Sequence, residues 1–270
     1  MTRKTTTMAK KGPDLSALRE RCLQHFAVLR IPLTAEQLDR FLAEAEREAW
    51  PPLVFLDHLL GEEAARKRER TTERRIVAAR FPERKALEVF DWNFNARFID
   101  RAQIEQLATG DFVRRRRNLI VIGQSGVGKS HLGQAIGLRL CAQGYRVLFT
   151  SSAEMIHNLG ASLADRSLHE RLRYYFRWDC LFIDDFGFDR VEREECPQAA
   201  PLLYKVIEAR HQKRSTAIVT NLDFDKWADY LRDPLIGMAF LDRFVEDATI
   251  IKIKKEAKSH RATRKPNPDA

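Results

Sequence analysis

The sequence predicts an α/β fold in which a mostly parallel β-sheet lies between helices, preceded by a small all-helical N-terminal domain. Two observations carry this prediction. From Asn118 onward, short apolar runs alternate with helical segments, a pattern typical of a parallel sheet covered on both faces. Before that point, residues 14–80 show helical periodicity interrupted by prolines, which indicates a separate helical domain.

The N-terminal domain is expected to contain three helices. The first covers residues 14–30 and ends before Pro32, and the second begins at the capping-box pair Thr34 and Gln37. Pro51 and Pro52 end the second helix, and the third helix begins near residue 53. Four leucines are expected on the buried side of this third helix: Leu53, Leu56, Leu59 and Leu60. Residues 1–13 are polar and basic, and we expect a flexible tail there.

The α/β part is expected to contain five strands, at residues 119–122, 146–150, 180–184, 216–220 and 249–253. Helices are expected between them, at residues 129–143, 153–163, 168–176, 201–212, 225–230 and 238–244. The α/β domain is expected to span residues 81–262, and residues 263–270 are expected to form a C-terminal tail.

Composition limits the classes of function. The 270 residues are 44% apolar, enough for a substantial core. The formal charge of +9 favours an anionic partner, with nucleic acid first, although a basic protein need not bind one. The four cysteines are far apart, so we expect reduced thiols rather than disulfides or zinc ligands. No apolar run is long enough to span a membrane, so a soluble cytoplasmic protein is expected.

The strongest motif is a phosphate-binding loop between the first predicted strand and the helix that follows it. It fits the pattern G-x-x-x-x-G-K-[ST]. In this motif, glycines allow the backbone N–H groups to surround phosphates, the lysine reaches the β- and γ-phosphates, and the serine hydroxyl ligates magnesium. The alternative is a glycine turn that happens to precede a Lys-Ser pair. The expected nucleotide-binding residues are Gly123, Gln124, Ser125, Gly126, Val127, Gly128, Lys129, Ser130 and His131.

A second element follows about fifty residues later, where the apolar strand CLFI ends in Asp184 and Asp185. Such a pair completes an NTPase site: Asp184 would hold magnesium together with Ser130, and Asp185 would orient and deprotonate the attacking water. The alternative is a buried strand that ends in two solvated acids. Because the phosphate-binding loop precedes the pair at this separation, the sequence favours the catalytic interpretation.

Two further polar residues are candidates for the same site. Asn221 follows the strand TAIVT and could hydrogen-bond the hydrolytic water or the γ-phosphate, although asparagine is also common in turns. Arg243, in LDRF, could stabilise transition-state charge at a neighbouring subunit's nucleotide. Its alternative is a local surface arrangement with Asp242. Arg261 is a weaker candidate for a phosphate contact in its own subunit.

A basic segment lies between the two expected domains. Residues 62–85 contain nine Lys or Arg and five Glu. Arg66, Arg70 and Arg74 stand at i, i+4 and i+8, so they line one helical face and could follow a phosphate backbone. The alternative is a solvated face with internal pairs such as Glu62 with Arg66. Residues 114–117 are four consecutive arginines that could bind DNA, a neighbouring subunit or solvent alone.

The set GQSGVGKS, LFIDDFG, IVTN and LDRF resembles the AAA+ ATPases of the initiator and helicase-loader branch. The approach ARFPERKALEVFD before the loop is similar to the IstB-like ATPases, bacterial helper proteins encoded beside a transposase in insertion sequences. The resemblance implies an AAA+ P-loop domain over residues 81–262. It makes Lys129 part of Walker A, Asp184 and Asp185 Walker B, Asn221 sensor 1, Arg243 a trans arginine finger and Arg261 a sensor 2 equivalent.

The sequence departs from the family pattern at two positions. Many AAA+ proteins have glutamate where Asp185 stands, and the shorter side chain implies slow or activated hydrolysis. His260 replaces a tyrosine that is common beside the C-terminal arginine, which leaves the role of Arg261 in doubt. The nucleotide's adenine is expected to contact residues 90–99, before the loop.

The resemblance implies a regulator of transposition that uses ATP and magnesium. It would assemble as a homo-oligomer on double-stranded DNA, recruit or activate a transposase and leave when ATP is hydrolysed. A replicative helicase loader of the same branch would share every ATPase residue. A P-loop kinase acting on a small molecule is a third alternative, but it would need neither Asn221 nor an arginine from a neighbouring subunit.

Overall fold

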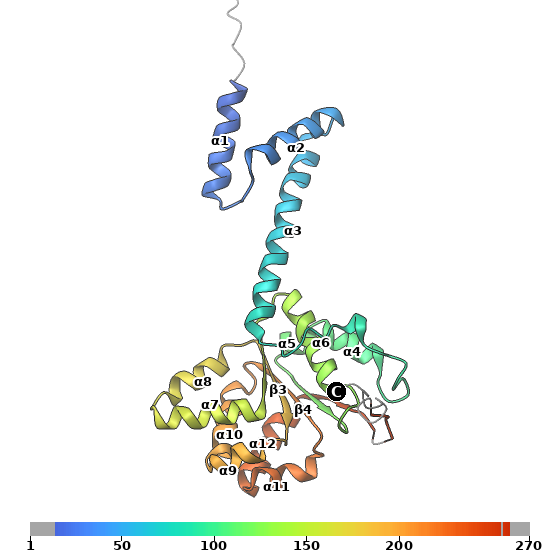
Figure 1. Cartoon of the computed structure of the whole chain (residues 1–270), viewed down its shortest axis with the longest axis vertical. Coiled ribbons are helices and arrows are strands. Elements are labelled where there is room, and N and C mark those ends of the chain that lie inside the picture. Colours follow the sequence, from blue (N-terminus) through green and yellow to red (C-terminus); the bar gives the residue numbers. More distant parts are fainter. Residues whose placement is uncertain (1–13, 255, 260–270) are drawn as a thin grey trace, which may run out of the picture. The chain divides into compact units, whose positions relative to one another are not determined.

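The computed structural model describes residues 14–254 and 256–259. By its internal contacts the chain divides into two compact units, Met1–Thr71 and Thr72–Ala270 (Figure 1). This division falls inside α3 (Pro52–Ala79), whereas the boundary expected from the sequence lies after residue 80, just past the end of that helix. The reason is packing, because Ala79 belongs to the core of the second unit and Ile76 packs against it.

The first unit is helical, as expected. It contains α1 (Leu15–Val28), α2 (Ala35–Arg47) and the first part of α3. The predicted capping box begins α2: the N–H of Gln37 donates to Thr34 Oγ1 at 3.2 Å, and the N–H of Thr34 donates to Gln37 Oε1 at 2.9 Å. A small core closes the unit, formed by Leu33, Leu38, Phe41 and Leu59.

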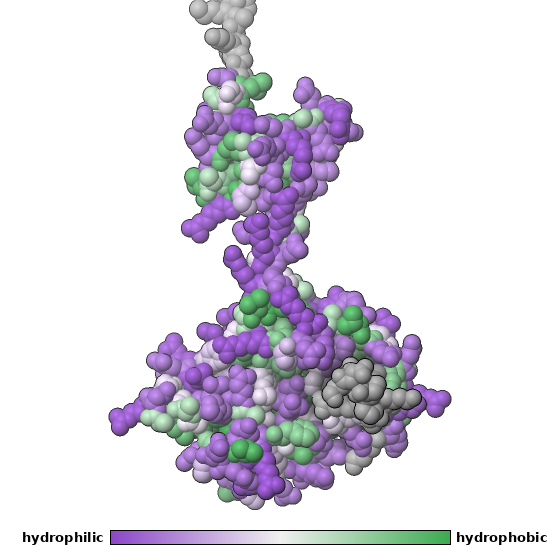
Figure 2. Space-filling model, viewed as in Figure 1, coloured by the Kyte–Doolittle hydropathy of each residue, from purple (hydrophilic) through white to green (hydrophobic). Residues whose placement is uncertain are grey.

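The prediction for the leucines of α3 is wrong for three of the four. Leu59 is 3% exposed, but Leu53, Leu56 and Leu60 are 78%, 48% and 46% exposed. The small core meets α3 only on the side that carries Leu59. Apolar atoms are therefore visible at the surface of this unit (Figure 2).

The second unit is built on a five-stranded sheet in which every pairing is parallel, as predicted. Its strands are β1 (Asn118–Ile122), β2 (Val147–Ser151), β3 (Cys180–Phe186), β4 (Ser215–Thr220) and β5 (Ala248–Lys252). They lie in the order β2-β3-β4-β1-β5. Because β4 lies between β1 and β3, the sequences that follow these three strands meet at one edge of the sheet.

Helices connect the strands and cover both faces of the sheet. They are α4 (Arg101–Ala108), α5 (Asp111–Arg114), α6 (Lys129–Ala142), α7 (Ser152–Ala164), α8 (Leu168–Phe176), α9 (Arg190–Glu195), α10 (Ala199–Arg210), α11 (Trp227–Leu231) and α12 (Pro234–Val245), with 3-10 turns η1 (Leu87–Val89) and η2 (Phe224–Lys226). Helix α9 was not predicted; its sequence RVEREE has little apolar periodicity and none of its residues is buried.

Side chains of β1 alternate between two cores, which is why this strand reads as a continuous apolar run. Leu119 and Val121 pack with the core that includes α4 and α6. Ile120 and Ile122 pack with α7, α10 and α12 on the other face. No helix in the described ranges is long and apolar enough to cross a membrane.

Candidate nucleotide-binding site

The loop between β1 and α6 has the backbone that its glycines predict. Gly126 and Gly128 have φ values of 81° and 98°, in the left-handed region that favours glycine. A Cβ on Gly128 would also lie 3.1 Å from Cε2 of Phe90. The backbone conformation at residue 128 therefore favours glycine, and a larger side chain there would also press on Phe90.

Lys129 and Ser130 begin α6, where backbone N–H groups lack helical acceptors and favour an anion. Lys129 Nζ donates to the carbonyl of Gln124 at 2.8 Å, across the loop. Ser130 Oγ donates to Asp184 Oδ1 at 3.1 Å. The two motifs predicted to form one site are therefore in direct contact, although 54 residues separate them.

Asp184 lies at the end of the buried part of β3 and is 7% exposed. Burial raises the pKa of its carboxyl, and the charge of Asp185 adds to this effect, while hydrogen bonds from Asp185 N–H and Ser130 oppose it. A buried carboxylate next to a serine hydroxyl is costly without a cation but is a suitable pair of oxygen ligands for magnesium.

Asp185 has a left-handed backbone with φ of 51°, unusual for a residue other than glycine. The conformation accompanies a register shift between β3 and β4 after Ile183. Three hydrogen bonds hold the residue: its N–H donates to Asp184 Oδ1 at 2.9 Å, and its carbonyl accepts from Ser152 Oγ at 3.1 Å and Phe188 N–H at 2.9 Å. The exposed carboxylate consequently turns toward the cavity rather than into a core.

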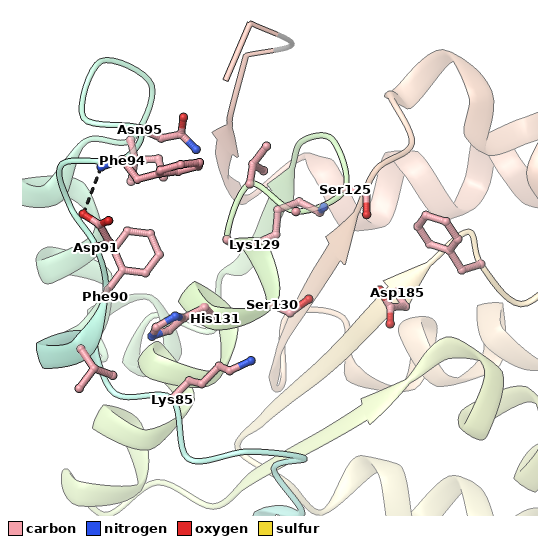
Figure 3. A pocket seen from close by; sticks show the side chains of 16 residues that line it. Lys85, Phe90, Asp91, Phe94, Asn95, Ser125, Lys129, Ser130, His131 and Asp185 are labelled. Carbon is pink, nitrogen blue, oxygen red and sulfur yellow. Dashed lines mark hydrogen bonds between the residues drawn. The ribbon is translucent and has the colours of Figure 1, made fainter. Parts of the chain in front are cut away.

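A cavity of about 550 Å³ lies over the loop (Figure 3). Its floor is formed by residues of the loop and the first turn of α6, and Asp185 and Phe188 line it from the end of β3. Its remaining wall comes from the segment before β1, through Lys85, Val89, Phe90, Asp91, Phe94, Asn95 and Ile99.

That wall is fixed to the loop and to the C-terminal part of the chain. The Phe90 ring meets the His131 ring edge-on at 5.0 Å, and His131 Nε2 lies 3.0 Å from the carbonyl of Ala86. Asn95 exchanges two hydrogen bonds with the backbone of Lys258, at 3.0 and 3.1 Å. Residues 90–99, expected near adenine, thus border the cavity.

Lys85 and Phe188 line the cavity but were not among the predicted site residues. Lys85 belongs to the FPERK approach, which was used only for the family resemblance. Phe188 follows the acidic pair and is 57% exposed despite its apolar ring. An aromatic residue directly after a glycine, as Phe188 is after Gly187, gives little indication in the sequence of its role.

Asn221 directly follows β4, between the ends of β1 and β3, and its side chain is exposed. It does not line the cavity described above. Its neighbour Thr220 is buried and donates through Oγ1 to the carbonyl of Phe186 at 2.7 Å, which joins the ends of β4 and β3. The position at the strand end agrees with the sequence prediction; a contact with a nucleotide stays a prediction.

Arg243 does not line the cavity either. Its guanidinium donates to Glu208 Oε1 at 2.8 Å and to the hydroxyl of Tyr204, both on α10. It also lies over the Tyr204 ring, 5.2 Å from the centroid. The local partners are therefore residues of α10, and the side chain is 35% exposed. Arg261 and His260 lie outside the described residues.

The three arginines predicted to contact DNA differ in their surroundings on α3. Arg66 forms ion pairs with Glu62 and Glu63, at 3.1 and 2.6 Å. Arg70 and Arg74 are exposed, and neither has an ion pair within the described part of the chain. The interpretation as internal Glu–Arg pairs thus applies to Arg66, whereas the other two have free access to solvent.

Residues 24–266 match the family model described as IstB-like ATP binding protein. A putative insertion sequence ATP-binding protein of Sinorhizobium fredii is 32% identical over 235 residues, 87% of this chain and 77% of that protein. The insertion sequence IS21 putative ATP-binding protein of Pseudomonas aeruginosa is 30% identical over 88% of each chain.

Solved structures are similar in fold. DnaI has a TM-score of 0.52 at 23% identity, covering 63% of this chain and 92% of that one. AMPPCP-bound DnaA from Aquifex aeolicus has a TM-score of 0.52 at 19% identity, covering 65% of this chain and 51% of that one. These likenesses confirm the expected AAA+ P-loop fold of the second unit.

Proposed function

This chain belongs to the family of IstB-like ATP-binding proteins, and from that premise we propose that it is an ATP-dependent, DNA-binding regulator of transposition. It assembles as a homo-oligomer on duplex target DNA, recruits or activates a partner transposase, and is released when ATP is hydrolysed. The observation that supports this proposal most is the hydrogen bond between Ser130 and Asp184, which joins the two halves of an ATPase site. The relatives named as insertion-sequence proteins favour this function over helicase loading.

The loop binds the triphosphate of ATP through its backbone N–H groups and the start of α6. Lys129 exchanges its contact with the Gln124 carbonyl for the phosphates. Ser130 and Asp184 would hold magnesium, which would neutralise part of the charge of the triphosphate. The nearby residues 90–99 enclose the adenine, and Phe90 connects this wall to the first turn of α6 through its contact with the His131 ring.

Asp185 positions and deprotonates the attacking water. Its backbone is held by hydrogen bonds from Ser152 and Phe188, which fix the point from which the side chain reaches toward the cavity. Asn221, at the end of the adjacent strand, completes the polar rim on the γ-phosphate side. Because aspartate is one methylene shorter than glutamate, turnover is slow, which suits a switch.

Arg243 acts on the nucleotide of a neighbouring subunit. In the isolated chain Glu208 and Tyr204 hold its guanidinium, so it has to exchange these partners for phosphate oxygens upon assembly. A partly exposed ion pair contributes only about 0–1 kcal/mol to stability, so losing the pair with Glu208 costs little free energy. Turnover would then depend on assembly, because the arginine at each nucleotide comes from a neighbouring subunit.

DNA contact by Arg66, Arg70 and Arg74 is part of the same proposal. Arg70 and Arg74 supply the available charge, and Arg66 contributes when it leaves Glu62 and Glu63. Contacts of this kind are made to phosphates and carry no sequence information. Target choice would then depend on DNA shape or on the transposase.

The test is duplex DNA binding measured by fluorescence anisotropy with ATP, a non-hydrolysable ATP analogue or ADP. We expect tight binding with ATP or the analogue and weak binding with ADP. A matched pair of variants, Lys129→Ala and the exposed α10 substitution Lys205→Ala, separates nucleotide control from general loss of charge. Equal DNA affinity in all nucleotide states would contradict the proposal.

A further inference from the structure

The amino-terminal edge of the sheet carries a second concentration of positive charge. In a parallel sheet, the loops that lead into the strands meet at the edge opposite the strand ends that form the nucleotide site. The loops into β2, β3, β4 and β1, which are adjacent in that order, contain seven basic residues: Arg115, Arg116, Arg117, Arg146, Arg177, Lys213 and Arg214. Asp179 is the one acidic residue in these four loops.

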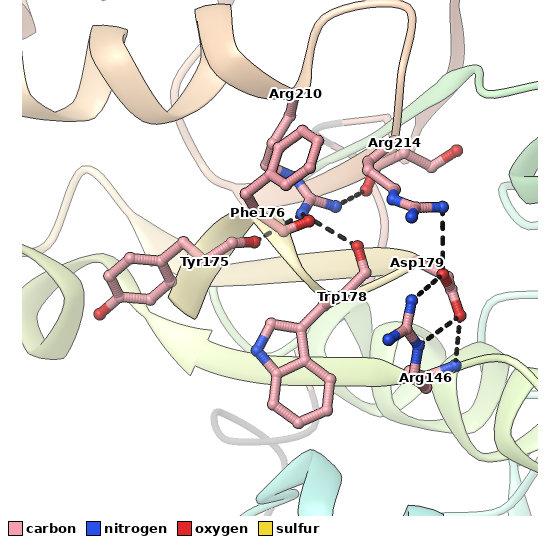
Figure 4. Close-up of polar contacts among 8 residues, drawn as sticks. Arg146, Tyr175, Phe176, Trp178, Asp179, Arg210 and Arg214 are labelled. Carbon is pink, nitrogen blue, oxygen red and sulfur yellow. Dashed lines mark hydrogen bonds and ion pairs between the residues drawn. The ribbon is translucent and has the colours of Figure 1, made fainter. Parts of the chain in front are cut away.

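Most of this charge is available to a partner. Asp179 pairs with Arg146 at 2.9 Å and with Arg214 at 3.3 Å (Figure 4). Arg115 pairs with Asp111 at 3.1 Å. The other four, Arg116, Arg117, Arg177 and Lys213, are exposed and have no carboxylate partner within the described residues.

A buried arginine on α10, Arg210, ties together the segments that lead into β3 and β4. Arg210 is 1% exposed, and it donates from Nη1 to the carbonyls of Tyr175 and Trp178, at 2.6 and 3.0 Å, and from Nε to Thr216 Oγ1 at 2.9 Å (Figure 4). Burial lowers its pKa to about 10, so it keeps its charge at neutral pH. The loops into β3 and β4 are thus fixed relative to each other before any partner binds.

We infer that this edge is a contact surface for the phosphate backbone of duplex DNA. The four unpaired charges stand on the loops into three adjacent strands, β3, β4 and β1. At about 4.8 Å between strands, these loops span roughly 10 Å. Phosphates follow one another at about 3.4 Å of helix axis along each strand of B-DNA, so roughly three phosphates lie beside them. Unpaired positive charges on adjacent strands of one sheet follow the regular spacing of those strands, which suits a polyanion with regularly spaced phosphates.

The sign of the charge changes where the row ends. The loop into β5, beside β1, contains Glu246 and Asp247, both exposed. These acids would repel a backbone that continued past β1, so they limit the contact to the four basic loops. The surface lies at the edge opposite the ATP site, so nucleotide can enter while DNA is bound. This inference rests on the proposed function and adds a surface to it.

The test compares two triple variants of the full chain that lose the same charge. Arg116→Gln, Arg117→Gln and Lys213→Gln remove unpaired charge from the edge, whereas Arg166→Gln, Lys205→Gln and Lys226→Gln remove exposed charge from other loops and helices. A third variant, Arg116→Lys with Arg117→Lys, keeps the charge. Duplex DNA affinity is measured as a function of salt with a non-hydrolysable ATP analogue, and nucleotide affinity and the unfolding temperature confirm folding.

The slope of log affinity against log salt is negative, and we expect the edge variant to make it shallower by about 2 to 3, since each lost phosphate contact removes about 0.9 from its magnitude. The control and lysine variants should keep the wild-type slope. Equal slopes in the edge and control variants overturn the inference and leave the proposed function standing. If the wild-type protein binds no duplex DNA, both the inference and the proposed function are overturned. If polyglutamate binds the edge at concentrations where duplex DNA does not compete with it, the inference is overturned and the edge is assigned to an acidic protein.

Discussion

Ser130, at the start of α6, donates a hydrogen bond to Asp184, at the end of β3, over 3.1 Å. The pair joins β3 to the helix that follows β1, and these two strands are separated in the sheet by β4. It therefore depends on the strand order and not only on two local motifs. Because Asp184 is buried and its pKa is raised, the arrangement stores an unfavourable charge that a cation would relieve.

Asp184→Asn should stabilise the ligand-free protein at neutral pH while weakening magnesium-dependent nucleotide binding. The folded-state pKa of Asp184 is raised above the ordinary aspartate value of 3.8, so ionisation costs stability as pH rises through the interval between them. Asparagine removes that cost and keeps the Oδ1 acceptor for Ser130 and Asp185 N–H. The unfolding temperature of both proteins between pH 4 and 7 measures this.

The difference in unfolding temperature should be largest at neutral pH and should shrink toward pH 4, where the wild-type carboxyl is increasingly protonated in both states. A variant that is less stable than wild type at pH 7 would show that Asp184 is stabilised by its neighbours rather than strained by burial.

Asp185→Asn should retain assembly on DNA and lose ATP turnover. Asparagine tolerates the left-handed backbone at φ of 51°, so the loop geometry survives, but the amide cannot accept a proton from water. Phosphate release measures turnover and sedimentation measures assembly. Turnover at the wild-type rate in the Asn variant would exclude a base role for this carboxylate.

Gly128→Ala should destabilise the loop by about 1–2 kcal/mol, because alanine is strained at φ of 98°, and its Cβ would press on Phe90. We expect a lower unfolding temperature and a loss of nucleotide affinity. Gly61→Ala is the matched control: it lies inside α3, has nothing within 4 Å of the new Cβ, and should gain roughly 0.5–1 kcal/mol. The prediction fails if both variants bind nucleotide as wild type does.

The fold of the second unit could be predicted from the sequence because its signals are local. Each of the first four strands is a short apolar run followed by a helical segment, and the side chains of β1 alternate between two cores. The glycine loop and the acidic pair were identified for the same reason: the residue types that bind phosphate and magnesium are few, and their spacing to the strands is fixed.

Features that depend on distant partners could not be predicted. Leu53, Leu56 and Leu60 have the periodicity of a buried helix face, but the small core covers only the side of Leu59. Lys85 reaches the cavity because its segment folds over the loop, which has no sequence signature. The carboxylate of Glu208, which holds Arg243, lies 35 residues away on another helix.

Arg243→Ala should leave nucleotide binding intact and abolish turnover in the assembled state. If the guanidinium serves a neighbouring subunit, an equimolar mixture with Lys129→Ala protein should regain part of the activity, since a mixed junction can combine an intact loop with an intact arginine. Glu208→Gln frees Arg243 from its local ion pair, and it should not reduce turnover. Absence of any recovery in the mixture would assign Arg243 to its contacts with Glu208 and Tyr204 alone.

The central claim is that ATP controls assembly on DNA, and sedimentation velocity tests it most directly. The full chain is mixed with duplex DNA and either a non-hydrolysable ATP analogue or ADP, with Lys129→Ala protein in parallel. The account predicts a large protein–DNA complex with the analogue, monomer with ADP and monomer for the Lys129 variant in both. A monomer that persists with the analogue and duplex DNA, or complexes of the same size in ADP, would contradict it.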